Sequence, residues 1–379
     1  MSVTLLPRAL KVTRTALTDT LALQREWEEL QQRSDSSVFL SWQWIGCWLA
    51  VYQPPVEVIR VMSGADLVGL ALVVPVVERR HGVIRSRCLR LHQTGIPEQD
   101  QIWIEYNGFL ACSGMEQQVS EVIFHYLGRQ QNWDEFVAGG INSGMARRFT
   151  DISGLPSHIR WKAPCYGVDL QQLRQSGKAY LDGLSGNTRH QIRRSARLYR
   201  EQEGELRIHR PENPDEAVAM FDDMAPGHIA RWGKGPYGSG FNNPWFVRFH
   251  RALIRQSWAD GGVELMQLRA GGRVLAAFYN LCYRNTVYFY LGVTSAETDN
   301  RLKPGLLGHS LCIEDYLDRG FRFYDFMGGQ ERYKVSLGQQ HSHLVQISLQ
   351  RPRMNLTLER ALRALRHGYV SCTRNVDGH

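Results

Sequence analysis

The sequence predicts an α/β protein built from two copies of one plan, each with a mixed sheet. The chain has 379 residues, which is enough for two domains of ordinary size. Apolar strand patterns alternate with helical patterns through both halves. Two strand–turn–strand segments, Val56–Leu72 and Val263–Leu281, lie at one constant offset of 207 residues, which also matches Gly64 with Gly271. Chance similarity between apolar strands is the alternative to a duplication, because identities are few.

The first half, residues 1–164, opens with two helical patterns and continues with strands. The helices are predicted at Thr18–Gln32, with Asp19 near its start, and at Ser41–Tyr52. Further along the chain we predict strands at Val56–Met62, Leu67–Val77, Arg85–Leu91, Gln101–Tyr106 and Asp134–Ala138, a helix at Met115–Arg129 and a linker at Ser153–Pro164.

The second half, residues 165–350, repeats this order. The helix Pro244–Trp258 lies over Ser37–Val51 at the same offset, and Phe326–Gly329 resembles Val137–Gly140. Residues 351–379 are predicted to form a helix and tail. The helix, Asn355–His367, is expected to pack on the second domain through its leucines.

The stretch Asp299–Lys334 is predicted to be loop, helix, strand and a polar Gly-Gly turn. Its loop is basic and contains glycine, its helix begins near Leu306, and Gly320 ends that helix. Free backbone N–H groups and the positive end of the helix dipole favour an anion at such a loop. We therefore expect a phosphate-bearing cofactor at Lys303–His309 and reactive groups at Asp325–Lys334.

The same stretch carries a family resemblance. Arg301–Leu307, Ile313-Glu314, Tyr324–Phe326, Gly329, Glu331 and Tyr333-Lys334 resemble the BioF2-like, cellulose-biosynthesis-associated acetyltransferase domain. That domain is a branch of the Gcn5-related N-acetyltransferase (GNAT) superfamily and is akin to the Fem-type aminoacyltransferases. The resemblance extends from Gly186 to Lys334 and implies two tandem acetyltransferase-like (GNAT) domains.

The resemblance implies acetyl-CoA or another acyl-CoA as co-substrate. The basic loop and the aromatic strand Thr286–Val293 beside it supply the predicted cofactor-binding residues: Tyr290, Arg301, Lys303, Gly305, Leu306, Gly308 and His309. The first half has no such loop, since its counterpart Gln93–Gln101 lacks the basic pair. One cofactor site, in the second copy, is therefore expected.

The predicted catalytic residues are His228, Asp325, Glu331, Tyr333 and Lys334. His228 suits a general base, and packing or capping is its alternative role. Tyr333 is placed like the tyrosine that protonates the departing thiolate in many GNAT enzymes. Lys334 is either catalytic or a structural partner of Asp325. The family often has Asp at position 330 and Gly at position 327, where this chain has Gln330 and Met327.

A basic helix at Asn187–Gln202 supplies the predicted substrate-binding residues of the second half. Asn187 is the expected N-cap, and Arg189, Arg193, Arg197 and Arg200 share one face. The resemblance favours contact with an anionic substrate through Asn187, Arg189 and Arg193, while a solvated face is the alternative. Arg231 and Trp232 complete the set, in a His-x-x-Arg-Trp pattern that recurs in the family.

Composition limits the kinds of ligand and the cellular compartment that we expect for this protein. The net charge is +8 with a pI near 9.2, which suits a pyrophosphate, an acidic sugar or RNA and equally a generally basic surface. Seven cysteines without C-x-x-C spacing indicate reduced thiols and no metal site. The sequence shows no signal peptide and no apolar run long enough for a membrane span, so a cytoplasmic location is expected.

Together these features predict an acyl-CoA-dependent N-acyltransferase. The resemblance suggests a small-molecule or saccharide acceptor, an amine of a cell-envelope or polysaccharide precursor, and no DNA. The alternatives are a Fem-type transferase that uses aminoacyl-tRNA, and a non-catalytic binding protein on a decayed acetyltransferase fold. The oligomeric state, the acyl chain length and the choice between N- and O-acylation are open.

Overall fold

The computed structural model describes residues 9–80, 84–235 and 238–361. Its elements up to the middle of the chain are β1 (Leu10–Ala16), α1 (Thr20–Gln32), α2 (Trp42–Tyr52), β2 (Glu57–Ser63), β3 (Asp66–Arg80), β4 (Ile84–Leu91), α3 (Pro97–Asp100), β5 (Leu110–Ala111), α4 (Glu116–Arg129), β6 (Glu135–Asn142), α5 (Ser143–Ser153) and β7 (Ser157–Asp169).

The remaining elements are α6 (Leu170–Ser176), α7 (Gly186–Glu203), β8 (Leu206–His209), α8 (Pro214–Asp223), α9 (Ala225–Trp232), α10 (Pro244–Ser257), β9 (Val263–Ala270), β10 (Arg273–Tyr283), β11 (Thr286–Thr294), α11 (Pro304–Asp318), β12 (Phe323–Gly328), α12 (Arg332–Leu337) and β13 (Gln339–Gln350).

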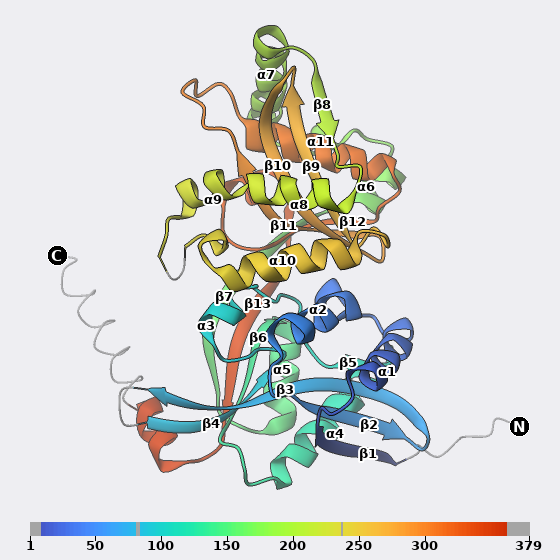
Figure 1. Cartoon of the computed structure of the whole chain (residues 1–379), viewed down its shortest axis with the longest axis vertical. Coiled ribbons are helices and arrows are strands. Elements are labelled where there is room, and N and C mark those ends of the chain that lie inside the picture. Colours follow the sequence, from blue (N-terminus) through green and yellow to red (C-terminus); the bar gives the residue numbers. More distant parts are fainter. Residues whose placement is uncertain (1–8, 81–83, 236–237, 362–379) are drawn as a thin grey trace, which may run out of the picture.

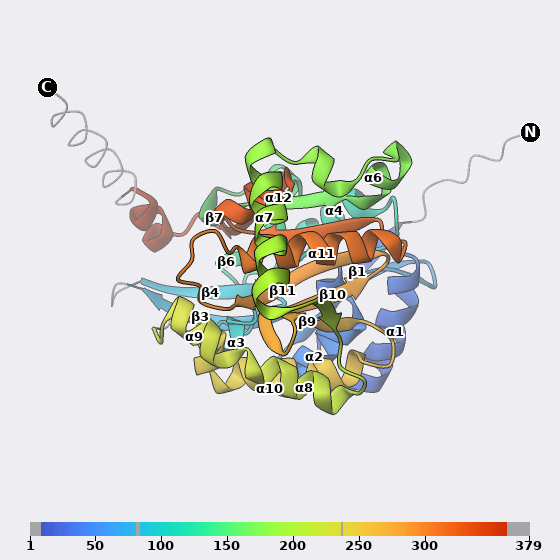
Figure 2. The ribbon, with the colours of Figure 1, turned by 90° about the horizontal axis from the view of Figure 1, so that it is seen from above.

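These elements form two lobes stacked along the long axis of the molecule (Figure 1). The first lobe holds α1–α5 and β1–β6, and the second lobe holds α6–α12 and β8–β12. One mixed sheet continues through both, in the order β1-β2-β3-β4-β6-β13-β7-β12-β11-β10-β9-β8, with β5 paired to β3. In the second lobe α7 and α11 cover one face of the strands, and α8 and α10 cover the other (Figure 2).

The two lobes repeat one topology, so the predicted two-copy plan is confirmed at the level of the fold. Gly64 and Gly271 have φ of 66° and 53°, and they turn the antiparallel pairs β2–β3 and β9–β10. This left-handed backbone favours glycine. A parallel pair follows in each lobe, β4 with β6 and β11 with β12. The predicted fold class, two tandem acetyltransferase-like (GNAT) units with mixed sheets, is therefore the one observed.

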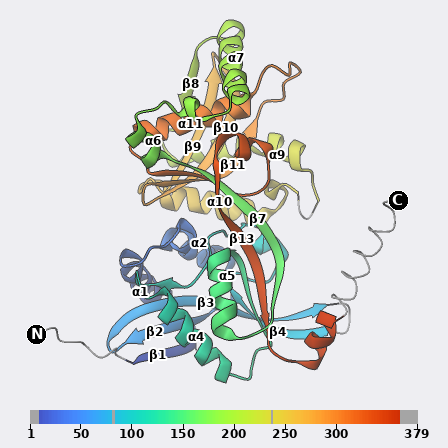
Figure 3. The same ribbon diagram turned by 180° about the vertical axis from the view of Figure 1, so that it is seen from behind.

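The lobes exchange their last strands. β7 ends the first copy but pairs with β12 of the second lobe, whereas β13 ends the second copy and pairs with β6 of the first. β7 and β13 also pair with each other and run together between the lobes (Figure 3). The predicted linker Ser153–Pro164 is therefore wrong, because most of it lies in β7. The boundaries at 164 and 350 stay predictions, and the first of them falls inside a strand.

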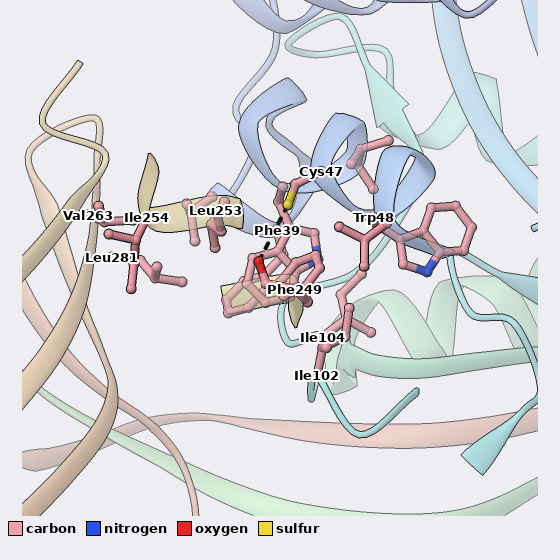
Figure 4. Packing of buried hydrophobic residues seen from close by; sticks show 14 of the residues in the cluster. Phe39, Cys47, Trp48, Ile102, Ile104, Phe249, Leu253, Ile254, Val263 and Leu281 are labelled. Carbon is pink, nitrogen blue, oxygen red and sulfur yellow. Dashed lines mark hydrogen bonds between the residues drawn. The ribbon is translucent and has the colours of Figure 1, made fainter. Parts of the chain in front are cut away.

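A hydrophobic core joins the lobes where α2 packs on α10 (Figure 4). Phe39, Cys47 and Trp48 come from the first lobe and Phe249 and Leu253 from the second, and each is almost inaccessible to solvent. The Cys47 thiol donates to the carbonyl oxygen of Phe249 at 3.6 Å. Burial of this much apolar surface favours a fixed contact between the lobes.

The segment predicted as strand Gln101–Tyr106 is not a strand. Trp103 and Tyr106 have φ of 45° and 48°, which breaks the extended conformation. Asn107 then fixes the loop, because its side-chain amide donates to the carbonyl oxygens of Leu91 at 3.0 Å and Gly139 at 3.1 Å. The loop thereby bridges β4 and β6 just beyond their paired residues.

The helix predicted at Asn355–His367 packs on the first lobe rather than the second, in its described part. Arg353 pairs with Asp134 at 3.0 Å, and Arg80 pairs with Glu359 at 2.9 Å. Leu356 lies between Arg353 and Glu359 in the sequence and is fully buried. Positions 362–367, with their two predicted leucine contacts, lie outside the described residues.

We expect Leu356→Ala to lower the free energy of unfolding by about 2–5 kcal/mol, because it removes a fully buried side chain and leaves a cavity. Leu358 is 61% exposed on the same helix, so Leu358→Ala should change it by less than about 0.5 kcal/mol. Urea unfolding of both variants measures the difference. Equal stabilities would show that this helix is not part of the folded first lobe.

Candidate active site

The two parallel strands of the second lobe separate after a short paired stretch. β11 and β12 pair over Thr286–Tyr288 and Phe323–Asp325 only. Beyond this stretch a cleft of about 370 Å³ opens between them. Its lining comes from the strands, from α9, α11 and α12, and from the first lobe: Trp103, Glu105, His228, Arg231, Trp232, Gly238, Phe278, Phe289, Tyr290, Leu291, Gly292, Thr294, Gly305, His309, Phe326, Met327, Gly328, Glu331, Tyr333 and Lys334.

β11 carries a bulge at Tyr290 along one wall of the cleft. Tyr279 pairs with Leu291 and Asn280 with Phe289, so Tyr290 has no partner on β10. Its hydroxyl donates to the Ile102 carbonyl oxygen of the first lobe at 2.5 Å. The phenol of Tyr290 is therefore an inter-lobe contact, and burial holds its pKa well above the usual value. The bulge also leaves the backbone of Tyr290 without a partner on β10.

The start of α11 lies at the mouth of the cleft. Lys303 is the N-cap, Pro304 is the first helical residue, and Gly305 lines the cleft, where an added Cβ would lie 3.4 Å from a Thr294 methyl group. The Lys303 ammonium group donates to the Asn300 side chain, and its backbone N–H donates to Ser195 Oγ at 2.9 Å. Free N–H groups at this end suit a phosphate group.

Three other predicted cofactor residues lie apart from the cleft. Arg301 is exposed and paired with Asp299 at 2.8 Å. Leu306 packs against the core of the second lobe. Gly308 serves close packing, because a Cβ there would meet the Phe278 ring at 2.7 Å. Arg301, Leu306 and Gly308 therefore stabilise the loop and the helix and do not line the cleft.

Tyr333 and His309 stack in the floor of the cleft. Their rings are parallel, with centroids 5.0 Å apart. The His309 Nδ1 atom lies 3.2 Å from the Tyr324 hydroxyl, and burial lowers the pKa of His309 to about 3. His309 is therefore neutral near pH 7 and does not hold an anion by charge. Burial and the Glu331 carboxylate raise the pKa of Tyr333, so its phenol keeps its proton.

Lys334 is buried and engaged next to the Gly-Gly turn. Its ammonium group donates to the Gly328 carbonyl oxygen at 2.6 Å and pairs with Glu331 at 3.1 Å. The alternative pairing with Asp325 is wrong.

Asp325 faces away from this cleft. It lines a second pocket of about 390 Å³ on the other side of β12, with residues such as Ser36 and Tyr106. Its carboxylate accepts the Met327 N–H at 2.7 Å and lies 3.5 Å from His341 Nε2. Met327 has φ of 61°, a left-handed conformation that favours glycine. These contacts give Asp325 a role in holding the β12 turn.

His228 lies on α9 at the edge of the cleft. Its Nδ1 atom is 2.7 Å from Ser239 Oγ, and burial together with Arg231 lowers its pKa to about 4. Arg231 and Trp232 follow on the same helix and are exposed, with the guanidinium 5.0 Å from the indole centroid. Arg231 therefore brings a positive charge to the cleft mouth.

The basic helix α7 does not reach the cleft. Ser185, not Asn187, is its N-cap, since the Ser185 hydroxyl accepts the Thr188 N–H at 3.1 Å. Its apolar side packs on the core of the second lobe, so the arginine face points outward. Arg189 pairs with Asp182 at 3.4 Å, and Arg193 is exposed. None of the predicted residues Asn187, Arg189 and Arg193 lines the cleft.

Sequence reasoning missed Glu105. This residue comes from the first lobe, and its Oε2 atom accepts the Gly328 N–H at 2.9 Å across the cleft. Burial raises its pKa to about 7. No motif marks the position, because the contact joins residues that are 223 apart in the chain.

Residues 186–335 match the family model of the acetyltransferase (GNAT) domain. The chain therefore carries a GNAT-type acyltransferase domain. A search of the curated proteins finds no match to the chain. The narrower likeness to the BioF2-like type stays a prediction.

Solved structures share the fold of the whole chain. FemX superposes with a TM-score of 0.59 at 10% identity, covering 92% of this chain and 99% of its own. A conserved protein of unknown function from Bacteroides thetaiotaomicron gives 0.53 at 13% identity, with 89% and 100% covered. The C-terminal domain of a putative lysylphosphatidylglycerol synthetase from Agrobacterium fabrum gives 0.52 at 11% identity, with 91% and 96% covered. At these identities the likeness concerns the fold alone.

Three further observations concern metal ligands, cysteines and membrane-spanning helices. Among the described residues no group of His, Cys, Asp or Glu side chains is arranged to hold a metal ion. The six cysteines of the described ranges are free thiols. In the same ranges no helix combines the length and the apolar character that crossing a bilayer requires.

Proposed function

We propose that the chain is an acyl-CoA-dependent N-acyltransferase whose donor site is the cleft between β11 and β12. The observation that carries this proposal is the separation of the two parallel strands beside the glycine-containing start of α11. The backbone around the Tyr290 bulge would bind the pantetheine arm, and the α11 N-terminus with Lys303 would bind the pyrophosphate. Acetyl-CoA is the donor we expect.

The chain's own residues supply positioning and proton transfer. The amine nitrogen of the acceptor would attack the thioester carbonyl carbon, and the carbon–sulfur bond would then break. Tyr333 would give its proton to the departing thiolate. A basic side chain of the cleft would receive the proton of the acceptor; His228 and Glu331, the bases predicted from the sequence, both line this cleft.

The first lobe is expected to bind no acyl-CoA. Its opening between β4 and β6, which corresponds to the cleft, is occupied by the loop that carries Asn107. A Cβ on Gly140 would also lie 2.0 Å from the Ile104 carbonyl oxygen, which shows how closely this loop approaches β6. One donor site per chain follows.

An aminoacyl-tRNA-dependent reaction is the second candidate. Fold similarity to FemX over 92% of the chain and the outward arginine face of α7 favour it. A basic helix face of this kind suits a nucleic-acid backbone, although ordinary solvation explains it equally well. The cleft beside the start of α11 favours acyl-CoA over aminoacyl-tRNA as the donor. The non-catalytic alternative gains no support from a cleft that keeps Glu331, Tyr333 and Lys334 together.

The acceptor we propose is an amine of a cell-envelope or polysaccharide precursor, bound as a small molecule or saccharide. A cytoplasmic location is part of the same proposal, since acyl-CoA is found there. Neither DNA nor a resident metal ion is required by this chemistry.

A turnover assay tests the proposal. The full-length protein is incubated with acetyl-CoA and a panel of amino sugars and peptidyl amines, and free thiol release is followed. A parallel reaction contains aminoacyl-tRNA in place of acetyl-CoA. We expect acceptor-dependent thiol release from acetyl-CoA. Acyl transfer from aminoacyl-tRNA alone would instead establish the second candidate.

A further inference from the structure

The first lobe places one carboxylate in the cleft of the acetyltransferase domain. Glu105 lies in the loop before β5 and lines the cleft together with Glu331, Tyr333 and Lys334. Its Oε2 atom accepts the Gly328 N–H at 2.9 Å, at the point where β12 ends. The hydrogen bond fixes one oxygen of the carboxylate against β12.

The charged groups around Glu105 come from both sides of the cleft. Lys334 of α12 and the Gly328 N–H favour its ionised form, while Asp325 of β12 and Glu331 before α12 oppose it. Burial outweighs the favourable contacts and raises its pKa to about 7. A carboxyl group in this range is half ionised near neutral pH, where a general base is most effective.

We propose that Glu105 is the general base of the reaction, so that the first lobe completes the catalytic centre of the second. This inference rests on the proposed acyl transfer to an amine. The contact between the two lobes then has a chemical role, because it holds a catalytic carboxylate of the first lobe in the donor cleft of the second.

Glu105 takes one proton from the acceptor ammonium group, which frees the nitrogen lone pair. That lone pair forms the new bond to the thioester carbonyl carbon, and the carbon–sulfur bond breaks with its electron pair on sulfur. The thiolate receives a proton from Tyr333, which regains one from the nitrogen as the amide forms. Glu105 then releases its proton to solvent.

The two bases considered before are placed less well for this task. His228 has Nδ1 bound to Ser239 and a pKa near 4, so its basicity is low. The Glu331 carboxylate forms an ion pair with the Lys334 ammonium group at 3.1 Å, which makes it less available to accept a proton. Glu105 has no side-chain ion pair with a described residue.

The pH dependence of kcat/KM separates these bases. In the wild type we expect kcat/KM to rise with pH and level off above an apparent pKa near 7, because the ionised form of Glu105 is active. A His228 base would give a rise near pH 4 and a flat profile from pH 6 upward. The flat profile would overturn the proposal.

Substitutions at the same position separate catalysis from structure. Glu105→Gln keeps the length of the side chain and an oxygen that can accept the Gly328 N–H, but it removes the carboxylate. Glu105→Asp keeps a carboxylate on a side chain that is one methylene shorter. If Glu105 is the general base, Glu105→Gln should lower kcat/KM on the order of 100-fold or more and abolish the rise near pH 7. Glu105→Asp should then keep partial activity and the rise with pH. A structural role predicts the reverse order, with Gln the milder change, and would overturn the proposal.

Glu98→Gln is the matched control, since Glu98 is exposed in the same inter-strand segment and does not line the cleft. Acetyl-CoA affinity and melting temperature are measured for every variant. Normal acetyl-CoA binding with low turnover in Glu105→Gln supports the base assignment. Full activity in this variant removes that assignment but leaves acyl transfer standing. A wild type without acetyl-CoA turnover removes both, and the two failures are thereby distinct.

Discussion

Tyr333→Phe should lower kcat by about 10²–10⁴-fold and leave acyl-CoA affinity nearly unchanged. The substitution keeps the ring that stacks on His309 at 5.0 Å and removes only the hydroxyl. Within the described part of the chain that hydroxyl has no hydrogen-bond partner, so its loss should not disturb the fold. Single-turnover and steady-state rates with acetyl-CoA measure the effect.

The raised pKa of Tyr333 determines how its proton can reach the thiolate. A phenol has a pKa of about 10 and a thiol about 8.5 in water, so proton transfer from tyrosine to thiolate is uphill even before burial. Burial and Glu331 raise the phenol pKa further. The transfer should therefore be concerted with breakage of the carbon–sulfur bond, where the hydroxyl stabilises the developing charge.

Tyr324→Phe is the matched control for this prediction. It removes a hydroxyl that lies 3.2 Å from His309 Nδ1 and does not line the cleft. We expect a loss of stability of about 1 kcal/mol and a kcat close to the wild-type value. Full kcat in Tyr333→Phe would exclude the general-acid role. A higher acceptor KM at unchanged kcat would make Tyr333 a binding residue.

Lys303→Glu should abolish measurable acyl-CoA binding while the fold survives. Lys303 is the N-cap of α11, two residues before Gly305 in the cleft wall, and it is partly exposed. The change removes a charge-assisted contact of about 1.5–3 kcal/mol and adds repulsion toward the pyrophosphate, so affinity should fall on the order of 100-fold or more. Calorimetric titration with CoA gives the value.

Lys178→Glu makes the same charge change at an exposed position of the second lobe, outside the cleft lining. It should leave CoA affinity within about twofold, since exposed charges at a distance are screened by salt. Unaltered CoA binding by Lys303→Glu would show that the start of α11 does not hold the pyrophosphate.

Local patterns predicted much of the second lobe. The glycine that ends α11, at position 320, has φ of 89°, as a helix-terminating glycine often does. Glu331, Tyr333 and Lys334 were predicted as reactive groups, and the structure brings them into one cleft. These predictions depended on sequence neighbours, which periodicity and turn chemistry describe well.

The remaining features depend on contacts between distant residues. β7 contains Pro164 and exposes Ile159 and Trp161, so its pattern does not resemble a central strand. Whether Asp325 faces the cleft depends on the β12 register, since side chains alternate between faces. Glu105 reaches the cleft only because the lobes pack together, which no local pattern records.

Titration of the full-length protein with acetyl-CoA, beside a titration with aminoacyl-tRNA, tests most directly whether the β11–β12 cleft is the donor site. We predict that one acetyl-CoA binds per chain, that this binding is lost in Lys303→Glu and kept in Lys178→Glu, and that no aminoacyl-tRNA competes with it. Two acetyl-CoA molecules per chain, or binding of aminoacyl-tRNA with none of acetyl-CoA, would contradict it.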